Sequence, residues 1–319
     1  MDGWDKLIKA IDAYIAKEDI DLENILSEAG FVDSGDAIIE ISDIEAKIAR
    51  ALTAETRIIN RKLNESVDLA AFAEEWPDIA ALDNVDEVIA KIFFDSFNAN
   101  MQKLATSYIK QIDPELTVSA ITQRTTDWVQ SWSEELGQLM KLNTHATVER
   151  LLTENLRDGN SIVDFTRQLM DNGIRNEWYR ARTASLTEML TAHSVAQQEA
   201  IIQNPACEDK EWVHTGEHRN KPRENHVDLG GTIIRKDQPF SLIGKNGNTY
   251  YPMYPRDSSE LPASERINCH CIHRGIVNAN VLGLSLEERL ELQRRAIADD
   301  DGAWERELDA RNRAKAGIE

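Results

Sequence analysis

Side chains that can bind a metal ion gather in one short stretch of this chain. Five of the seven histidines and all three cysteines lie within residues 205–277. Cys269 and Cys271 are two positions apart, so both thiols point to the same side if the segment is extended. Zinc takes four tetrahedral nitrogen or sulfur ligands, and a small, loop-rich module gains folding free energy from binding it. The most economical ligand set is His218, His226, Cys269 and Cys271, which predicts a structural zinc ion.

A second interpretation of the same residues needs no metal. The ligand spacing is not that of a standard zinc finger, and Cys-x-Cys is less diagnostic than Cys-x-x-Cys. The cysteines are then small core residues, and the histidines are surface or hydrogen-bonded groups. A disulfide framework is excluded, because three cysteines cannot staple a chain of 319 residues. This cysteine usage favours a reducing, cytoplasmic setting.

Residues 212–226, WVHTGEHRNKPRENH, are dense in arginine, glutamate and histidine among turn residues. One of these histidines could act as a general base. Alternatively, the arginines and histidines hold the loop in place through hydrogen bonds. We favour the hydrogen-bond network, because the chain has no GxSxG, P-loop or GxGxxG motif. We therefore expect a protein that is not an enzyme and has neither catalytic nor cofactor-binding residues apart from the predicted zinc ligands.

Amphipathic helices are predicted for most of the chain before this module. Over residues 85–104, apolar side chains recur at steps of three and four, which defines one helix face. Gly159 is expected to end a later helix and Ser161 to cap the next one. Gly173 is expected to end that helix, before another over residues 177–202. A helical bundle is the natural way to bury so many apolar faces.

The sequence changes its character at residue 204. Five of the eight prolines lie between Pro222 and Pro262, and β-branched or aromatic triplets indicate short strands. Asn246-Gly247 is a strong hairpin signal, since a two-residue type I′ turn needs positive φ at both positions. Further on, Ser285 and Glu288 have the spacing of a capping box that begins a last helix. The predicted fold class is mainly α, with a small α+β module after the helical bundle.

The chain is therefore predicted to have three parts. The predicted boundaries give an acidic helical region over residues 1–144, a domain over 145–277 (helices 145–203 and the α+β module 204–277), and a C-terminal helix and tail over 278–319.

Charge is distributed unevenly. The chain has 36 Lys and Arg against 56 Asp and Glu, a net charge of -20, and residues 1–100 alone carry 23 acids and 9 bases. This balance counts against a DNA-coating protein, because phosphate binding needs clustered lysine and arginine. The acidic helices are either a solvated surface or a surface that docks on a basic protein. No apolar run approaches the roughly 18 residues needed to cross a membrane, and no signal-peptide pattern is present.

A series of short motifs runs through roughly residues 145–277. Two lie in the helices: LLTENLRDGNSIVDFTRQL at 151–169, and Thr187-Glu188. Those of the module are, in order, Trp212 with a charged turn, Arg223-Glu224-Asn225-His226, Leu229-Gly230-Gly231, Phe240, Tyr251-Pro252, and Arg266-Ile267-Asn268-Cys269-His270-Cys271. This ordered set resembles the phage head-morphogenesis, Mu F-like minor head protein family. Within it, Arg223, Gly230 and Asn268 are expected to be structural motif residues. The family often has arginine at the position of His270, and many members have an acidic residue at that of His218.

The resemblance implies a minor, capsid-associated head protein of a tailed bacteriophage or prophage that acts in procapsid assembly at or near the portal. The expected partners are the portal protein, capsid and scaffold proteins, and packaged DNA near the portal, but no membrane. The expected location is the head interior or portal region of the virion, and the host cytoplasm during assembly. The alternative is a metal-dependent nuclease or other hydrolase built on the His- and Cys-rich module.

Overall fold

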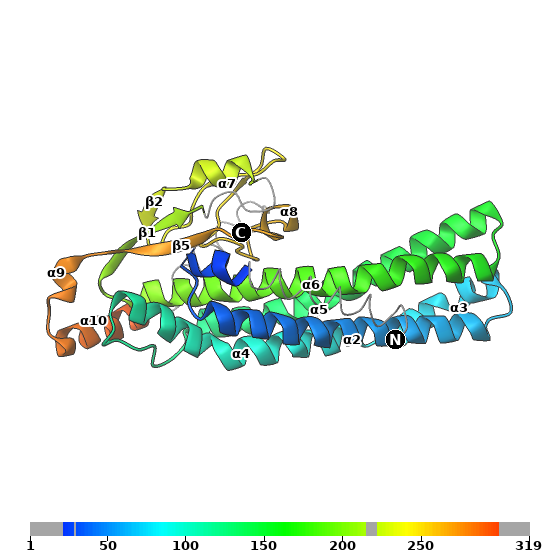
Figure 1. Ribbon diagram of the computed structural model, residues 1–319, viewed down its shortest axis with the longest axis horizontal. Coiled ribbons are helices and arrows are strands. Elements are labelled where there is room, and N and C mark those ends of the chain that lie inside the picture. Colours follow the sequence, from blue (N-terminus) through cyan, green and yellow to red (C-terminus); the bar gives the residue numbers. More distant parts are fainter. Residues whose placement is uncertain (1–21, 29, 215–221, 300–319) are drawn as a thin grey trace, which may run out of the picture. The chain divides into compact units, whose positions relative to one another are not determined.

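The computed structural model describes residues 22–28, 30–214 and 222–299, and within them no side chain of residues 170–176 or 178. His218, the predicted fourth zinc ligand, lies outside the described residues, as do the first 21 residues and the end of the predicted C-terminal part. The described part of the chain is mainly helical, its strands are short and lie after residue 206, and its last element is a helix, which confirms the predicted class (Figure 1). No helix among the described residues is long and apolar enough to span a membrane.

Five helices make up most of the described chain. They are α2 (Ser34–Glu65), α3 (Leu69–Leu82), α4 (Val85–Ile112), α5 (Gln123–Asp158) and α6 (Ile162–Gln203). The predicted face of α4 is buried, since Ile89, Phe93 and Phe97 are each at most 1% exposed. Its apolar side chains recur at helical spacing because that spacing puts them on one side of the cylinder.

The predicted helix end at Gly159 and the predicted cap at Ser161 are correct, but the predicted helix end at Gly173 is wrong. Gly159 adopts a φ of +68° after the end of α5, and the Asp164 amide donates to Ser161 Oγ at 3.2 Å at the start of α6. The helix then continues through Gly173 to Gln203. A glycine inside a helix costs only about 1 kcal/mol relative to alanine, so packing elsewhere can override it.

The strands form two small antiparallel sheets. In the first, β1 (Cys207–Val213) pairs with β2 (Ile233–Arg235) on one edge and β5 (Ile272–Val277) on the other (Figure 1). The second is the hairpin of β3 (Leu242–Ile243) and β4 (Thr249–Tyr250). Short helices complete the module and the following part: α7 (Glu224–Leu229), α8 (Ala263–Arg266), α9 (Ala279–Leu282) and α10 (Leu286–Asp299).

The predicted hairpin exists, although its turn differs from the predicted type. Gly247 has a φ of +78°, whereas Asn246 is not among the described residues with positive φ. The Gly244 amide donates to Asn248 O, and the Gly247 amide donates to Gly244 O. The loop is therefore longer than two residues, and a single left-handed glycine is enough to close it. The Ser285–Glu288 capping box is confirmed by reciprocal hydrogen bonds at the start of α10.

The described chain divides into two compact units. Unit 1 takes residues 22–40, 100–126 and 187–299, and unit 2 takes residues 41–99 and 127–186, with the gaps given above. Unit 1 includes the whole described part of the α+β module. The boundaries predicted near residues 144 and 277 remain a prediction.

Each unit contains an apolar core cluster. In unit 2, aromatic rings pack between helices, with Phe72 5.9 Å from Phe165 and 6.0 Å from Trp76, measured between ring centroids. In unit 1, Trp212 and Phe240 pack edge to face at 5.2 Å, beside the two cysteines of the Cys-x-Cys pair. Cys269 and Cys271, two of the four predicted metal ligands, thus lie in the core of the module.

Candidate metal centre

Two separate segments of unit 1 bring His226, Cys269 and Cys271 together. His226 lies on the single-turn helix α7, and the cysteines lie between α8 and β5. The three side chains are between 1% and 4% exposed. Their ligand atoms all lie within 4.8 Å of one another, which makes the group one that could hold a metal ion. The two positions of the Cys-x-Cys pair do face the same side, as predicted from their spacing.

The histidine is oriented by a carboxylate. Its Nε2 lies 3.1 Å from Glu265 Oε2, while its Nδ1 lies 3.5 Å from Cys269 Sγ and 3.7 Å from Cys271 Sγ. Glu265 is 1% exposed, and it also accepts hydrogen bonds from Asn225 Nδ2 and the Lys245 amide. A carboxylate bound to the far nitrogen of a histidine fixes the ring orientation and raises its basicity as a ligand. His226 therefore presents Nδ1 to the two sulfur atoms.

The two thiols differ in their acidity because they contact each other. A hydrogen bond from Cys271 holds the pKa of Cys269 well below its usual value, and His226 acts in the same direction. The same contact raises the pKa of Cys271 well above its usual value. The cluster thus offers two sulfur atoms and one imidazole nitrogen in contact, a soft donor set of the kind that zinc and other thiophilic ions select.

Arg256 fixes the backbone that carries both cysteines. Its Nη1 donates to Cys269 O and Cys271 O, at 2.7 Å each. Its Nη2 donates to Leu190 O at 2.9 Å and to Ser194 Oγ at 2.5 Å, both on α6. The side chain is fully buried, and its backbone φ is +68°. The sequence analysis missed this residue, because a single arginine in a proline-rich turn forms no pattern that marks it.

Two other residues of the module that could bind a metal ion, Cys207 and His273, lie outside this cluster. Cys207 is buried at the start of β1, and burial raises its pKa to about 11. His273 on β5 is fully buried, with its ring 6.2 Å from that of Tyr254. Of the four predicted ligands, the structure thus brings three together, and the contribution of His218 stays a prediction.

Comparison with known proteins agrees with the motif order. Residues 146–274 match the family model of phage Mu protein F-like proteins. The chain is also 33% identical over 313 residues to the uncharacterized protein YqbB of Bacillus subtilis (strain 168). This alignment covers 94% of this chain and 99% of that protein. The chain belongs to the phage Mu F-like family. No solved structure matches it.

The three Mu F-like motif residues lie in the segments on either side of the candidate metal centre. Arg223, at the N-terminus of α7, donates from Nε to Ser264 O and from Nη2 to Ile267 O, which connects this helix to the end of α8. Asn268 has a φ of +57°, a left-handed conformation that asparagine tolerates better than most residues. This turn directs the chain into Cys269. Gly230 is closely packed, since an added Cβ would meet Val227 O at 3.0 Å.

The Thr-Glu pair of the family lies on α6 and faces the protein interior. Thr187 and Glu188 are 3% and 4% exposed. Glu188 Oε1 lies 3.6 Å from Arg266 Nη1, and Arg266 also donates from Nε to Leu261 O. The motif glutamate therefore pairs with the arginine that begins the Arg-Ile-Asn-Cys-His-Cys motif. In this arrangement the pair of Glu188 and Arg266 connects α6 to the end of α8.

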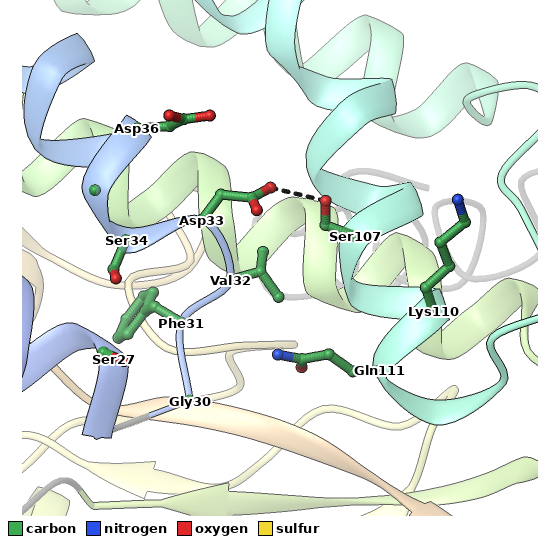
Figure 2. A pocket seen from close by; sticks show the side chains of 11 residues that line it. Ser27, Gly30, Phe31, Val32, Asp33, Ser34, Asp36, Ser107, Lys110 and Gln111 are labelled. Atoms are coloured by element: carbon green, nitrogen blue, oxygen red, sulfur yellow. Dashed lines mark hydrogen bonds between the residues drawn. The ribbon is translucent and has the colours of Figure 1, made fainter.

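A pocket of about 760 Å³ lies elsewhere in unit 1. Figure 2 shows its lining, in which Asp33 and Ser107 face each other and are joined by a hydrogen bond of 2.7 Å between Ser107 Oγ and Asp33 Oδ2. Asp36 and Lys110 also line it, but none of the three clustered metal ligands does. The candidate metal centre is therefore a buried core feature that does not open into this pocket.

Proposed function

We propose that this protein is a minor head protein of a tailed bacteriophage or prophage that acts, without enzyme activity, in procapsid assembly at or near the portal. The observation that carries the proposal is membership of the phage Mu F-like family, together with a relative that aligns along almost its whole length. Its partners are the portal protein and capsid or scaffold proteins, with packaged DNA nearby. It acts in the host cytoplasm during assembly and then in the head or portal region of the virion.

In this proposal, the cluster of His226, Cys269 and Cys271 holds a structural zinc ion. Two sulfurs and one imidazole nitrogen suit zinc, and cysteine-ligated zinc is more often structural than catalytic. The burial of all three ligands supports a structural role, because a catalytic ion needs a position open to substrate. The ion would fasten α7 to the segment before β5, across the small core around Trp212.

The hydrolase alternative makes a different prediction from the same cluster. It requires cleavage of DNA or another phosphodiester in the presence of Mg²⁺, Mn²⁺ or Zn²⁺, and it requires that cleavage stop in Cys269→Ser. The assembly proposal expects no cleavage above that of a heat-inactivated sample. Cleavage that depends on Cys269 would overturn the non-enzymatic part of the proposal.

The assembly role is tested by co-expressing the full chain with the portal and coat proteins of the same phage or prophage. Procapsids are then separated by sedimentation, and the amount of this chain per particle is measured with and without the portal protein. We expect a low, constant copy number that falls to background when the portal is omitted. Portal-independent incorporation would move the docking site to the coat or scaffold, and absence from all particles would refute the role in head assembly.

A further inference from the structure

A second group of potential ligands lies in unit 2, far along the sequence from the cysteines. Glu55 on α2, Asp83 just after α3 and His145 on α5 place one ligand atom each within 4.8 Å of the others. His145 Nε2 lies 2.9 Å from Asp83 Oδ2 and 4.0 Å from Glu55 Oε1. Atoms bound to one ion at about 2.1 Å lie roughly 3 to 4 Å apart, so small side-chain movements suffice to coordinate an ion.

In each of the two carboxylates, one oxygen accepts a hydrogen bond from a neighbouring residue, and the other is the ligand atom of the group. Thr144 Oγ1 donates to Glu55 Oε2 at 2.9 Å, and the Val85 amide donates to Asp83 Oδ1 at 3.0 Å. Within the described part of the chain, Glu55 Oε1 is buried and no N–H or hydroxyl group donates to it, and a hydrogen bond between Glu55 and Asp83 forms only when one of the two carboxyls carries a proton. A buried carboxylate oxygen without a donor is costly, which calls for a proton or a cation at this point.

Neighbouring residues that are not ligands themselves fix the orientation of Glu55 and His145. Arg180 Nη1 donates to Thr144 Oγ1 at 3.0 Å, and its Nη2 donates to Met140 O at 2.6 Å, so the guanidinium supports the threonine that holds Glu55. Trp76 packs edge to face on His145, with the ring centroids 5.4 Å apart. Such supporting contacts are typical of metal sites, where they fix the ligand orientation.

The side chains around this group are predominantly acidic. Around His145 and Arg180, the side chains that interact are the acids Glu55, Asp83, Asp86 and Glu177 and the bases Lys141 and Arg180. The acids outnumber the bases by two. Burial, and secondly the charge of Asp83, raises the pKa of Glu55 to about 8.

We propose that Glu55, Asp83 and His145 form a binding site for a divalent transition-metal cation, which ties α2, the end of α3 and α5 together in unit 2. Two carboxylate oxygens and one imidazole nitrogen suit ions such as Mn²⁺ and Zn²⁺. His145 and Asp83 are 13% and 11% exposed in their side chains, so the ion can enter from solvent while Glu55 closes the buried side. The site stabilises the helical unit, and it is independent of the cysteine cluster and of the assembly role.

Mn²⁺ is the probe of choice, because carboxylate and imidazole ligands accept it whereas a thiolate cluster selects softer ions. The full chain, without a polyhistidine tag, is freed of metal with a chelator and titrated with MnCl₂ while free Mn²⁺ is followed by electron paramagnetic resonance. We expect about one Mn²⁺ per wild-type chain. We also expect Glu55→Gln to weaken this binding by more than about tenfold, whereas Cys269→Ser retains it.

Glu154→Gln is the matched control, since Glu154 is an exposed carboxylate on the same helix as His145 and pairs with Arg150. It should leave Mn²⁺ affinity unchanged. Glu55→Gln replaces the carboxylate with a neutral group of the same shape, so the metal-free variant should melt at or above the wild-type temperature and lose only the rise caused by Mn²⁺. The proposal is overturned if the wild type binds no Mn²⁺, or if Glu55→Gln binds it as well as the wild type. In either case a shared proton would take the place of the ion.

Discussion

The two ligand clusters of this protein are held in place by different means. The cluster of His226, Cys269 and Cys271 lies in loops and on a single helical turn, and its position depends on side chains that bond to the backbone. The cluster of Glu55 and His145, with Asp83, is carried by long helices whose backbone groups already bond to one another. An irregular backbone leaves carbonyl groups that something must satisfy, and this explains why a buried arginine occurs at the first cluster.

The two clusters also differ in the chemistry of their ligand atoms, which are mostly sulfur in unit 1 and mostly carboxylate oxygen in unit 2. Cysteine side chains behave as small apolar groups and need few hydrogen bonds, so Cys269 and Cys271 can lie beside Trp212 and Phe240. Carboxylates are costly to bury, and those of unit 2 each keep a donor for one oxygen. We therefore expect loss of a ligand to unfold the loop-rich module, whereas the helical unit should tolerate it.

The strongest test of this contrast removes a thiol. Cys269→Ser should abolish zinc binding and lower the free energy of unfolding by about 4 kcal/mol or more, the effect of losing a ligand present far above its Kd. Zinc is measured by elemental analysis of protein purified without a histidine tag, and stability by urea denaturation. Cys207→Ser, a buried cysteine of the same unit outside the cluster, should keep the zinc and pay only a core penalty. Equal zinc content in the two variants would contradict the ligand assignment.

Removing Arg256 should be almost as damaging. Arg256→Met keeps much of the buried volume but leaves three carbonyl groups and one hydroxyl without their donor. Breaking a buried charged network of this kind costs about 3–5 kcal/mol. Arg274→Met serves as the control, since Arg274 lies on β5 of the same unit but its side chain is 62% exposed, so that its pair with Glu211 is worth at most about 1 kcal/mol. Similar urea midpoints for both variants would contradict the central role of Arg256.

The pH dependence of unit 1 should show the cost of a buried carboxylate. Burial raises the pKa of Asp257 from 3.8 to about 6. Because the folded-state pKa is raised, the folded chain binds the proton more tightly, so this group's contribution is complete below pH 3.8 and is lost as pH rises through 6. The shift corresponds to about 3 kcal/mol between these limits. The difference in unfolding free energy between the wild type and Asp257→Asn should therefore change by most of this amount, about 2.4 kcal/mol, between pH 4 and 7. A constant difference would indicate that the carboxyl titrates normally.

The smallest effect on stability is expected at the acidic surface of unit 2. Glu74, Glu75 and Asp78 are exposed on α3, and changing all three to lysine should alter the unfolding free energy by only about 0.5 kcal/mol per site. If this surface docks on a basic head protein, the triple variant should enter procapsids less well, and wild-type binding should weaken as salt screens the charges. Normal incorporation of a normally folded triple variant would show that these acids are only a solvated face.

The sequence by itself determined the features that depend on near neighbours. Helical spacing of apolar residues predicted the buried face of α4, and the Ser161 and Ser285 caps were readable because their partners lie three residues away. The two-residue spacing of Cys269 and Cys271 likewise placed both thiols on one side. Such features follow from local backbone geometry, which short stretches of sequence specify.

Only the tertiary structure decided which distant residues meet. It placed His226 against cysteines more than forty positions away, and it assigned Glu265 to orient the histidine. It also carried α6 through Gly173, where a local signal predicted an end, because the packing of a long helix outweighs a cost of about 1 kcal/mol. The meeting of Glu55, Asp83 and His145 has no trace in their spacing, since each comes from a different element and only the packing of helices brings them together.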